Sequence, residues 1–375
     1  MTQNTSNILQ IEDDGPVGVY DSGEAVQLTL ETMAERKAAM ADDRAVSNMF
    51  GIPEIDELVV PLWPGDYAFT IGLPSNGKSF LARMQALRIL NMLMSGNHTD
   101  RVVVWATAEE SVERVTTAWL AAISGVSATD MLSGKLSNVH SVTVNAAVSE
   151  VASWPLYVIG HVLGNHSSGT SKHTSSRLST ADIEACLDYI RDGREKQIVF
   201  FVMDYLQRVR KPLEISNREE HIRLTVDWGR DIANKFSTPV NMVTQAKFSV
   251  FDRSIPVPGL EDSEWSANAG QSADTMFSVW MPQTKPGVGE VVNYGKWRNL
   301  IVERGMLFVY VAKQKMGEAQ VAFLLRAQPH LMKWELLEIQ EIDLNSNSGD
   351  AKIGASNSRA YFNEWPQQAQ VPFGD

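Results

Sequence analysis

The segment "GLPSNGKS" at positions 72–79 carries the clearest chemistry in the sequence. Two glycines flank four residues, a lysine and a serine follow, and the segment lies between an expected strand and an expected helix. This is the spacing of a P-loop, in which glycines let backbone amides turn toward phosphate oxygens and the next helix offers its positive end to the same anion. Lys78 can reach the β and γ phosphates, and Ser79 can offer its hydroxyl to Mg²⁺. The residues expected to bind the nucleotide are Gly72, Ser75, Asn76, Gly77, Lys78, Ser79 and Phe80.

Hydrolysis of a bound triphosphate needs a carboxylate that helps to hold Mg²⁺ and a base that orients water. Asp204 ends the apolar run "IVFFVMD", which fits the metal side of such a site. Glu109 and Glu110 end "VVVWATAEE" and would emerge at the same edge of a parallel sheet, where either can polarise the attacking water. The alternatives are an ordinary aspartate at a strand end and acids favoured at a helix N-terminus by the helix dipole.

Strands and helices alternate along most of the chain, which predicts an α/β fold with a mostly parallel central sheet flanked by helices. The expected strands are residues 67–72, 101–108, 154–160, 198–207 and 240–245, and the expected helices are 80–94, 110–126, 179–197 and 218–239. Beyond a loop-like stretch at 248–271, residues 273–282 are expected to form a strand. Residues 305–315 and 319–327 are expected to close the sheet as an antiparallel hairpin.

Composition limits the class of protein. The chain has 375 residues, a hydrophobic content of 44% and a single cysteine, so its fold must rely on packing and not on disulfides. Its apolar runs are too short to cross a bilayer and its start lacks the pattern of a signal peptide, so we expect a cytoplasmic protein with no membrane contact. The formal charge of −12 argues against a surface coated with nucleic acid, but allows a local basic strip.

The chain is expected to divide into four parts. Residues 1–23 are expected to be a disordered tail and residues 24–49 a linker helix. One ATPase domain should span residues 50–340, and residues 341–375 should form a flexible C-terminal tail.

Together these segments resemble the ATPase domain of hexameric replicative DNA helicases of the DnaB type, within the RecA-like class of P-loop ATPases. "MDYLQ", which contains Asp204, is the most specific match. "PVNMVTQ" is similar to the strand whose final glutamine, here Gln245, senses the γ phosphate. "VVVWATAEESVERV" is similar to the strand and helix that carry the catalytic glutamate, which implies that role for Glu109. The resemblance covers about residues 50–334, in the family's order.

The chain departs from that family in its last motif. "VAKQKMGEA" resembles a hairpin that places an arginine finger in the neighbouring subunit's active site, but here the corresponding residue is Lys315, with Lys313 two positions before it. Lysine is a point charge and cannot make a bidentate phosphate contact. "AEES" also resembles the paired glutamates of KaiC-like ATPases, which leaves the base open between Glu109 and Glu110.

The resemblance implies an ATP- and Mg²⁺-dependent motor that assembles as a ring, a homo-oligomer expected to be hexameric, around single-stranded DNA. Two loops would face the channel, and their cations are Arg208, Arg210 and Lys211 in the first and Lys247 and Arg253 in the second. The plain alternative is that each is a solvated surface charge. Only some 50 residues precede the ATPase segment, so a primase or a loader would be a separate protein.

The expected function is therefore an ATP-dependent helicase. The first alternative is a KaiC-like or recombinase-like ATPase that remodels protein or coats DNA without unwinding it. The second is a ring that binds nucleotide without turning it over.

Overall fold

The computed structural model describes residues 20–41, 49–161, 177–211, 215, 217–264, 268–295, 297–315, 317 and 321–341. The chain separates into two compact units, Met1–Ala45 and Val46–Asp375. The first unit contains helix α1 (Ser22–Ala41), in the region where the sequence predicts a linker helix at 24–49. The tails expected at 1–23 and 341–375 fall almost wholly outside the described residues.

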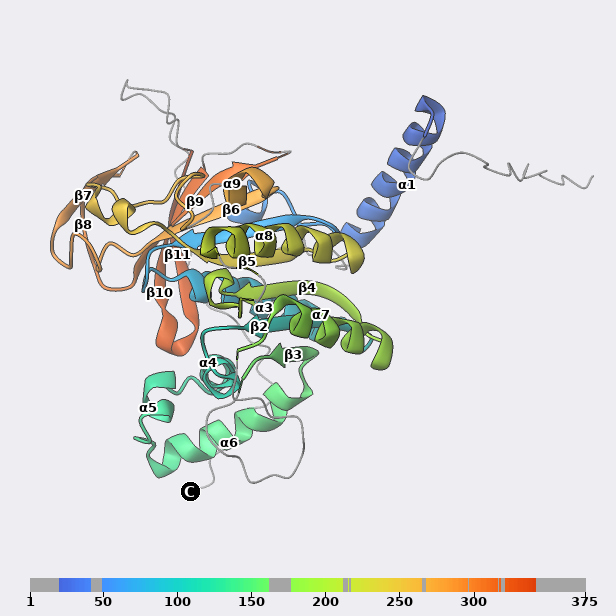
Figure 1. The fold of residues 1–375 in the computed structure, drawn as a ribbon. Helices are drawn as coiled ribbons and strands as arrows, with labels where there is room; N and C mark the ends of the chain where they lie inside the picture. The colour runs from blue at the N-terminus through green and yellow to red at the C-terminus, as the bar shows by residue number, and fades with distance from the viewer. Residues whose placement is uncertain are drawn as a thin grey trace, which may run out of the picture. The chain divides into compact units, whose positions relative to one another are not determined.

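A nine-stranded sheet forms the centre of the second unit (Figure 1). Its strand order is β11-β10-β9-β6-β1-β5-β4-β2-β3. All pairings among β1 to β6 are parallel, and β9, β10 and β11 continue the sheet in antiparallel fashion. The strands are β1 (Tyr67–Gly72), β2 (Arg101–Thr107), β3 (Leu156–Ile159), β4 (Gln197–Asp204), β5 (Val240–Gln245), β6 (Thr275–Trp280), β9 (Met306–Gln314), β10 (Val321–Gln328) and β11 (Lys333–Glu341). The expected fold class, with its closing antiparallel hairpin, is confirmed.

Helices cover both faces of this sheet, and each face has its own apolar core. The helices are α2 (Pro53–Asp56), α3 (Lys78–Ser95), α4 (Val112–Ser124), α5 (Ala128–Leu132), α6 (Asn138–Ser153), α7 (Thr180–Asp188), α8 (Arg218–Lys235) and α9 (Asn268–Ser272). Side chains of α3 and α4 share one core with Phe200 and Val202 of β4, whereas α7 and α8 share the other with Phe201 and Met203. Side chains alternate along a strand, so "IVFFVMD" is apolar throughout because both of its faces are buried.

The helices that follow the strands begin where the sequence provides caps. The Ser111 side chain accepts from the Arg114 amide at the start of α4, and Ser179 and Asp182 form a reciprocal capping box at the start of α7. The Asn217 side chain accepts from the Glu219 amide at the start of α8. These caps fix where each connection ends and each helix begins.

Several elements are not among those expected from the sequence. They include α5, α6, β11, the short helices α2 and α9, and a small hairpin of β7 (Val291–Tyr294) and β8 (Trp297–Ile301). The hairpin packs a third apolar core in which the Trp280 ring stacks on Phe308 and the Tyr294 ring stacks on Trp297. Within the part of the chain that the structure describes, no helix combines the length and apolarity needed to cross a bilayer.

Candidate nucleotide site and cationic surface

The carboxyl ends of four adjacent parallel strands bring the expected catalytic groups to one edge of the sheet. β1 ends at Gly72, which lies opposite Gln245 of β5, and Asp204 of β4 lies opposite Thr107 of β2. The turn after Thr107 carries Glu109. Ligands of open α/β sheets bind at this edge, because the loops that follow the strands converge there.

The loop between β1 and α3 depends on glycine at two positions. A Cβ on Gly72 would lie 2.7 Å from Cγ2 of Val279 on the neighbouring strand. Gly77 has φ +86° and caps α3, and Ser75 also has a positive φ, of 59°. Glycine accepts this left-handed conformation without strain. The loop therefore curls tightly into the N-terminus of α3, where the first amides have no intrahelical acceptor and can face an anion.

Two of the residues expected to bind nucleotide have side chains committed elsewhere. Asn76 is buried, and its Oδ1 accepts from the Met281 amide at 2.8 Å and from the Thr284 hydroxyl at 3.1 Å. Phe80 is buried in the apolar core and packs edge-on against the Trp334 ring. Asn76 thus braces the loop against the segment after β6, and Phe80 anchors α3.

Ser79 and Asp204 form a pair of oxygen ligands at the mouth of the loop. The Ser79 hydroxyl donates to Oδ1 of Asp204 at 3.0 Å, and Asp204 is only 2% exposed. Burial raises the pKa of Asp204 from an ordinary 3.8 to about 6, against the lowering effects of Arg83 and the Ser79 hydrogen bond. A hydroxyl and a carboxylate side by side are the hard oxygen ligands that Mg²⁺ prefers, so these residues fit a magnesium site. Among the described residues, no cluster of three or more His, Cys, Asp or Glu offers an all-protein metal site.

Lys78 lies in the same loop. Its Nζ donates to the Leu73 carbonyl oxygen at 2.9 Å, across the turn that a triphosphate would fill. Burial lowers the pKa of Lys78, while the nearby charges of Asp204 and Glu109 oppose that shift. The ammonium group is therefore held within the loop by a carbonyl oxygen, which an anionic ligand can replace.

The two candidate bases have different surroundings. Glu110 forms an ion pair with Arg83, and its amide and carbonyl both bond the Thr107 hydroxyl. Glu109 is exposed, and its pKa is raised by partial burial and by the charge of Glu110, while Arg208 lowers it. Glu109 is thus the more exposed of the two carboxylates, whereas the side chain and backbone of Glu110 are tied to Arg83 and Thr107. Arg83, which no sequence motif singles out, also lies over the Trp105 ring at 5.4 Å.

Gln245 lies at the end of β5, beside the loop. Its backbone amide donates to Oε1 of Gln207 at 3.2 Å. The Gln207 side chain also donates to the Thr244 hydroxyl at 2.8 Å. Gln207 is the last residue of "MDYLQ", so this motif ties the segment after β4 to the end of β5. Asp204 and Gln245 are thereby held at the same carboxyl edge of the sheet.

Lys313 and Lys315 lie at the other end of the sheet. β9 runs antiparallel to β6, and Lys313 lies opposite Met276 near the start of β6, whereas Gly72 lies opposite Val279. Three to five residues of strand therefore separate the lysines from the loop, roughly 10–17 Å. Lys313 donates to the carbonyls of residues 270 and 271, and Lys315 donates to Asp274 at 3.2 Å. The structure does not bring these lysines to the nucleotide loop of the same chain.

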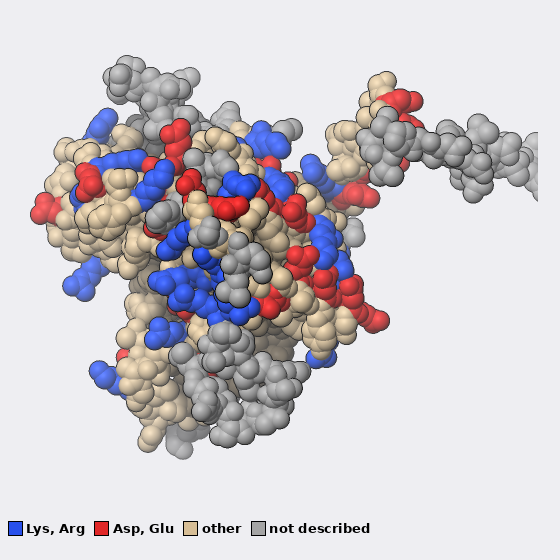
Figure 2. All heavy atoms as spheres, in the orientation of Figure 1, with Lys and Arg blue, Asp and Glu red and all other residues tan. Residues whose placement is uncertain are grey.

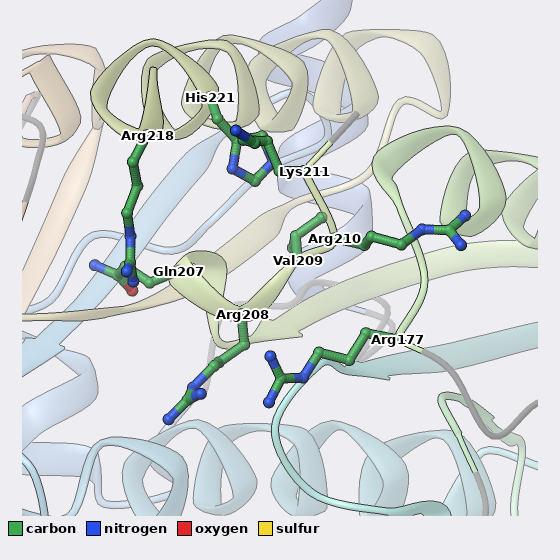
Figure 3. A pocket seen from close by; sticks show the side chains of 8 residues that line it. All are labelled: Arg177, Gln207, Arg208, Val209, Arg210, Lys211, Arg218 and His221. Carbon is green, nitrogen blue, oxygen red and sulfur yellow. The ribbon is translucent and has the colours of Figure 1, made fainter. Parts of the chain in front are cut away.

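The expected DNA-binding cations fall into two groups. Arg208, Arg210 and Lys211 line an open hollow after β4 (Figure 3), and Lys and Arg gather in the middle of this face of the molecule (Figure 2). In the second loop, Lys247 donates to the Glu261 carbonyl at 2.7 Å. Arg253 makes a two-point ion pair with Asp262 at 2.6 and 2.7 Å. These last two cations therefore hold their own loop together.

The mostly parallel sheet, with a P-loop at the carboxyl end of β1, defines a P-loop nucleotide-binding protein of the RecA-like class. The sequence matches the family described as "DnaB-like helicase C terminal domain" over residues 49–335, which is most of the chain. The chain belongs to that family. No curated protein matches the sequence.

Solved structures agree with this fold. One that is described as an "ATPase Domain" matches with a TM-score of 0.66 at 17% identity, covering 85% of this chain and 100% of that one. A second match is described as "The Structure Of A DnaB-Like Replicative Helicase And Its Interactions With Primase". It has a TM-score of 0.63 at 16% identity and covers 84% of this chain and 67% of that one.

Proposed function

We propose that this protein is an ATP-dependent DNA helicase motor that hydrolyses ATP at the subunit interfaces of a ring and moves along single-stranded DNA. The observation that carries the proposal is the contact of Ser79 with the buried Asp204 at the mouth of the P-loop, with Glu109 following the adjacent strand. Membership of the DnaB-like family supports the same function.

Each residue of the site has a role that its surroundings support. The loop amides and Lys78 would bind the phosphates of ATP, and Ser79 and Asp204 would hold Mg²⁺. Bound Mg²⁺ would neutralise charge on the phosphate oxygens. Glu109, the exposed carboxylate after β2, would orient the attacking water and accept its proton, and Gln245 would contact the γ phosphate.

Lys313 and Lys315 would act on a neighbouring subunit. They lie too far from their own loop to reach its phosphates, and Lys315 has a side chain that is 67% exposed in its ion pair with Asp274. Asp274 is buried and keeps its ion pair with Arg230 at 2.6 Å, so the exposed Lys315 can exchange Asp274 for a phosphate without leaving that carboxylate unpaired. A homo-oligomeric ring, hexameric in this proposal, would place these lysines at the next active site.

The proposed partners are single-stranded DNA and further replication proteins. Arg208, Arg210 and Lys211 would contact the phosphates of single-stranded DNA in the channel, with Lys247 and Arg253 supporting the second loop. A primase and a loader are further proposed partners. A primase is included because one of the similar structures is described as a replicative helicase together with its interactions with primase.

The test combines ATP hydrolysis with a forked-duplex assay. The expected result is phosphate release that depends on Mg²⁺, is stimulated by single strands and accompanies strand separation. Hydrolysis stimulated by single strands without separation under any loading condition would favour the recombinase-like or KaiC-like alternative. Absence of affinity for Mg²⁺-ATP in calorimetry would overturn the proposal entirely.

A further inference from the structure

An open hollow of about 400 Å³ lies between the carboxyl end of β4 and the start of α8 (Figure 3). The cations and the histidine that line it are Arg177, Arg208, Arg210, Lys211, Arg218 and His221. No aspartate or glutamate among the described residues lines it. In a chain with a formal charge of −12, this concentration of one sign of charge attracts anions to one place.

His221 provides an observation independent of the charge cluster. The residue is 5% exposed, and no described residue makes a hydrogen bond to its Nε2. Its ring projects from α8 toward the space that the cations of the loop line (Figure 3). A buried polar atom without a partner costs free energy, so such an atom at the wall of a cavity indicates that a ligand or water completes its bonding.

The charges that face His221 come from two elements. Burial lowers the pKa of the imidazole most, and the charges of Lys211 in the loop and Arg218 of α8 lower it further, so the neutral ring is favoured in the absence of an anion. The negative charge of an anion placed among these groups would offset the charges of Lys211 and Arg218 and so raise the pKa of the imidazole. The imidazole would then gain a proton and donate from Nε2.

Two cations of the rim, Arg208 and Arg210, have weak competitors for an incoming anion. Arg210 pairs with Asp182 at 2.8 Å, but both side chains are about half exposed. The Nε of Arg208 donates to the neutral hydroxyl of Tyr205 at 2.7 Å. Exposed pairs and neutral acceptors bind a guanidinium less strongly than a phosphate does, because phosphate offers charged oxygens in a two-point geometry.

We propose that this hollow is a phosphate-binding site that takes a backbone phosphate of a nucleic-acid strand, with His221 as its inner hydrogen-bond donor. Arg177 and Arg218, from outside the loop, complete it. The proposal rests on the proposed function, since it names where one strand phosphate would sit. It adds three residues that the loop motif alone does not indicate.

The experiment follows the His221 resonance by NMR in the full chain with labelled histidine, with His221→Gln identifying the signal among the seven histidines. The probes are a thymidine oligonucleotide and, separately, inorganic phosphate at matched ionic strength. Anisotropy of the labelled oligonucleotide measures binding in parallel. The variants Arg177→Gln and Arg218→Gln test the cations while leaving the buried His221 ring in place. Arg223→Gln is the matched control, because it removes one charge from an exposed site on α8 outside the hollow.

The expected result is that the oligonucleotide raises the pKa of His221 by at least about one unit, and that Arg177→Gln and Arg218→Gln each weaken its binding by about 3- to 10-fold. Each should also reduce the dependence of log affinity on log salt by about 0.7, while Arg223→Gln changes neither. An oligonucleotide that binds without changing the His221 titration overturns this site and leaves the proposed function standing. A shift produced only by inorganic phosphate overturns the assignment to a strand. Failure of the wild-type chain to bind the oligonucleotide overturns the proposed function itself.

Discussion

Replacing Asp204 by asparagine should stabilise the free protein and abolish its use of Mg²⁺-ATP. Asp204 is 2% exposed, and burial is the largest cause of its raised pKa. Above about pH 6 the folded protein therefore carries a buried negative charge that the unfolded chain would carry in water. Because this charge does not help folding, we attribute it to the proposed metal site.

The magnitude follows from the pKa. One pKa unit corresponds to about 1.4 kcal/mol, so the rise of the Asp204 pKa from 3.8 to about 6 corresponds to about 3 kcal/mol of lost stability. Because the folded-state pKa is the higher one, this cost is fully present above about pH 6, shrinks as the pH falls and disappears below about pH 4. Asparagine is neutral throughout. The free energy of unfolding of Asp204→Asn should exceed that of the wild type by about 3 kcal/mol near pH 8 and match it near pH 4.

Urea denaturation of both proteins across this pH range, without Mg²⁺ or nucleotide, measures the difference. Light scattering at each pH ensures that the two proteins have the same oligomeric state, since assembly contributes to apparent stability. Asp231→Asn is the control, because Asp231 is an exposed aspartate on α8. In a second arm, Mg²⁺-ATP should stabilise the wild type and not the Asp204 variant.

Two results would refute this reasoning. A variant less stable than the wild type near pH 8 would mean that the Asp204 charge is stabilised by its surroundings and not merely tolerated. A stability gain that stays constant toward pH 4 would come from packing, since only the removal of a titrating charge predicts a gain that vanishes as Asp204 is protonated.

Glu109→Gln should slow ATP hydrolysis by about 10²- to 10⁴-fold and preserve ATP binding. Phosphate release at the wild-type rate would show that another residue is the base. Glu110→Gln should slow hydrolysis less but lower the free energy of unfolding by about 1–2 kcal/mol, because it removes the charged partner of a largely buried arginine; equal stability in urea would contradict the ion pair as a structural element. Asn76→Ala should cost about 2–3 kcal/mol in the same measurement, since a buried amide and a hydroxyl lose their acceptor, and an unchanged midpoint would count against its role as a brace. Subunits carrying Glu109→Gln mixed with subunits carrying Lys313→Ala and Lys315→Ala should regain part of the activity that each lacks alone, and mixtures with no activity would exclude action between subunits.

Much of the fold could be predicted from the sequence because its signals are local. The P-loop is fixed by the spacing of Gly72, Gly77 and Lys78, and the parallel strands are apolar on both faces. Asp204 and Glu109 could be placed at one edge because parallel strands end at the same side of the sheet. Only the family resemblance assigns Gln245 to the site, and the strand register places it opposite Gly72.

The features that could not be predicted depend on contacts between distant segments. The Asn76 side chain bonds residues 281 and 284, more than 200 positions away, so nothing within the loop distinguishes a brace from a phosphate ligand. The β7–β8 hairpin is held by aromatic rings that belong to different strands, and no single segment carries its signal. His221 lies on the buried face of the amphipathic helix α8. Its position in the helical repeat is the same as that of a core residue, so the sequence pattern does not mark it as a ligand-binding residue.

The stretch from Asp204 to Lys211 belongs to both the proposed metal site and the proposed phosphate site. Asp204 faces Ser79, and Arg208, four residues on, lies at the hollow while its Nε donates to the Tyr205 hydroxyl. The charge of Arg208 also lowers the pKa of Glu109. A strand phosphate that draws Arg208 away would therefore weaken the cation that most favours the ionised form of Glu109, making that carboxylate a stronger proton acceptor. The proposed stimulation of hydrolysis by single strands would then require no large rearrangement, because the two proposed sites share one short segment and one guanidinium.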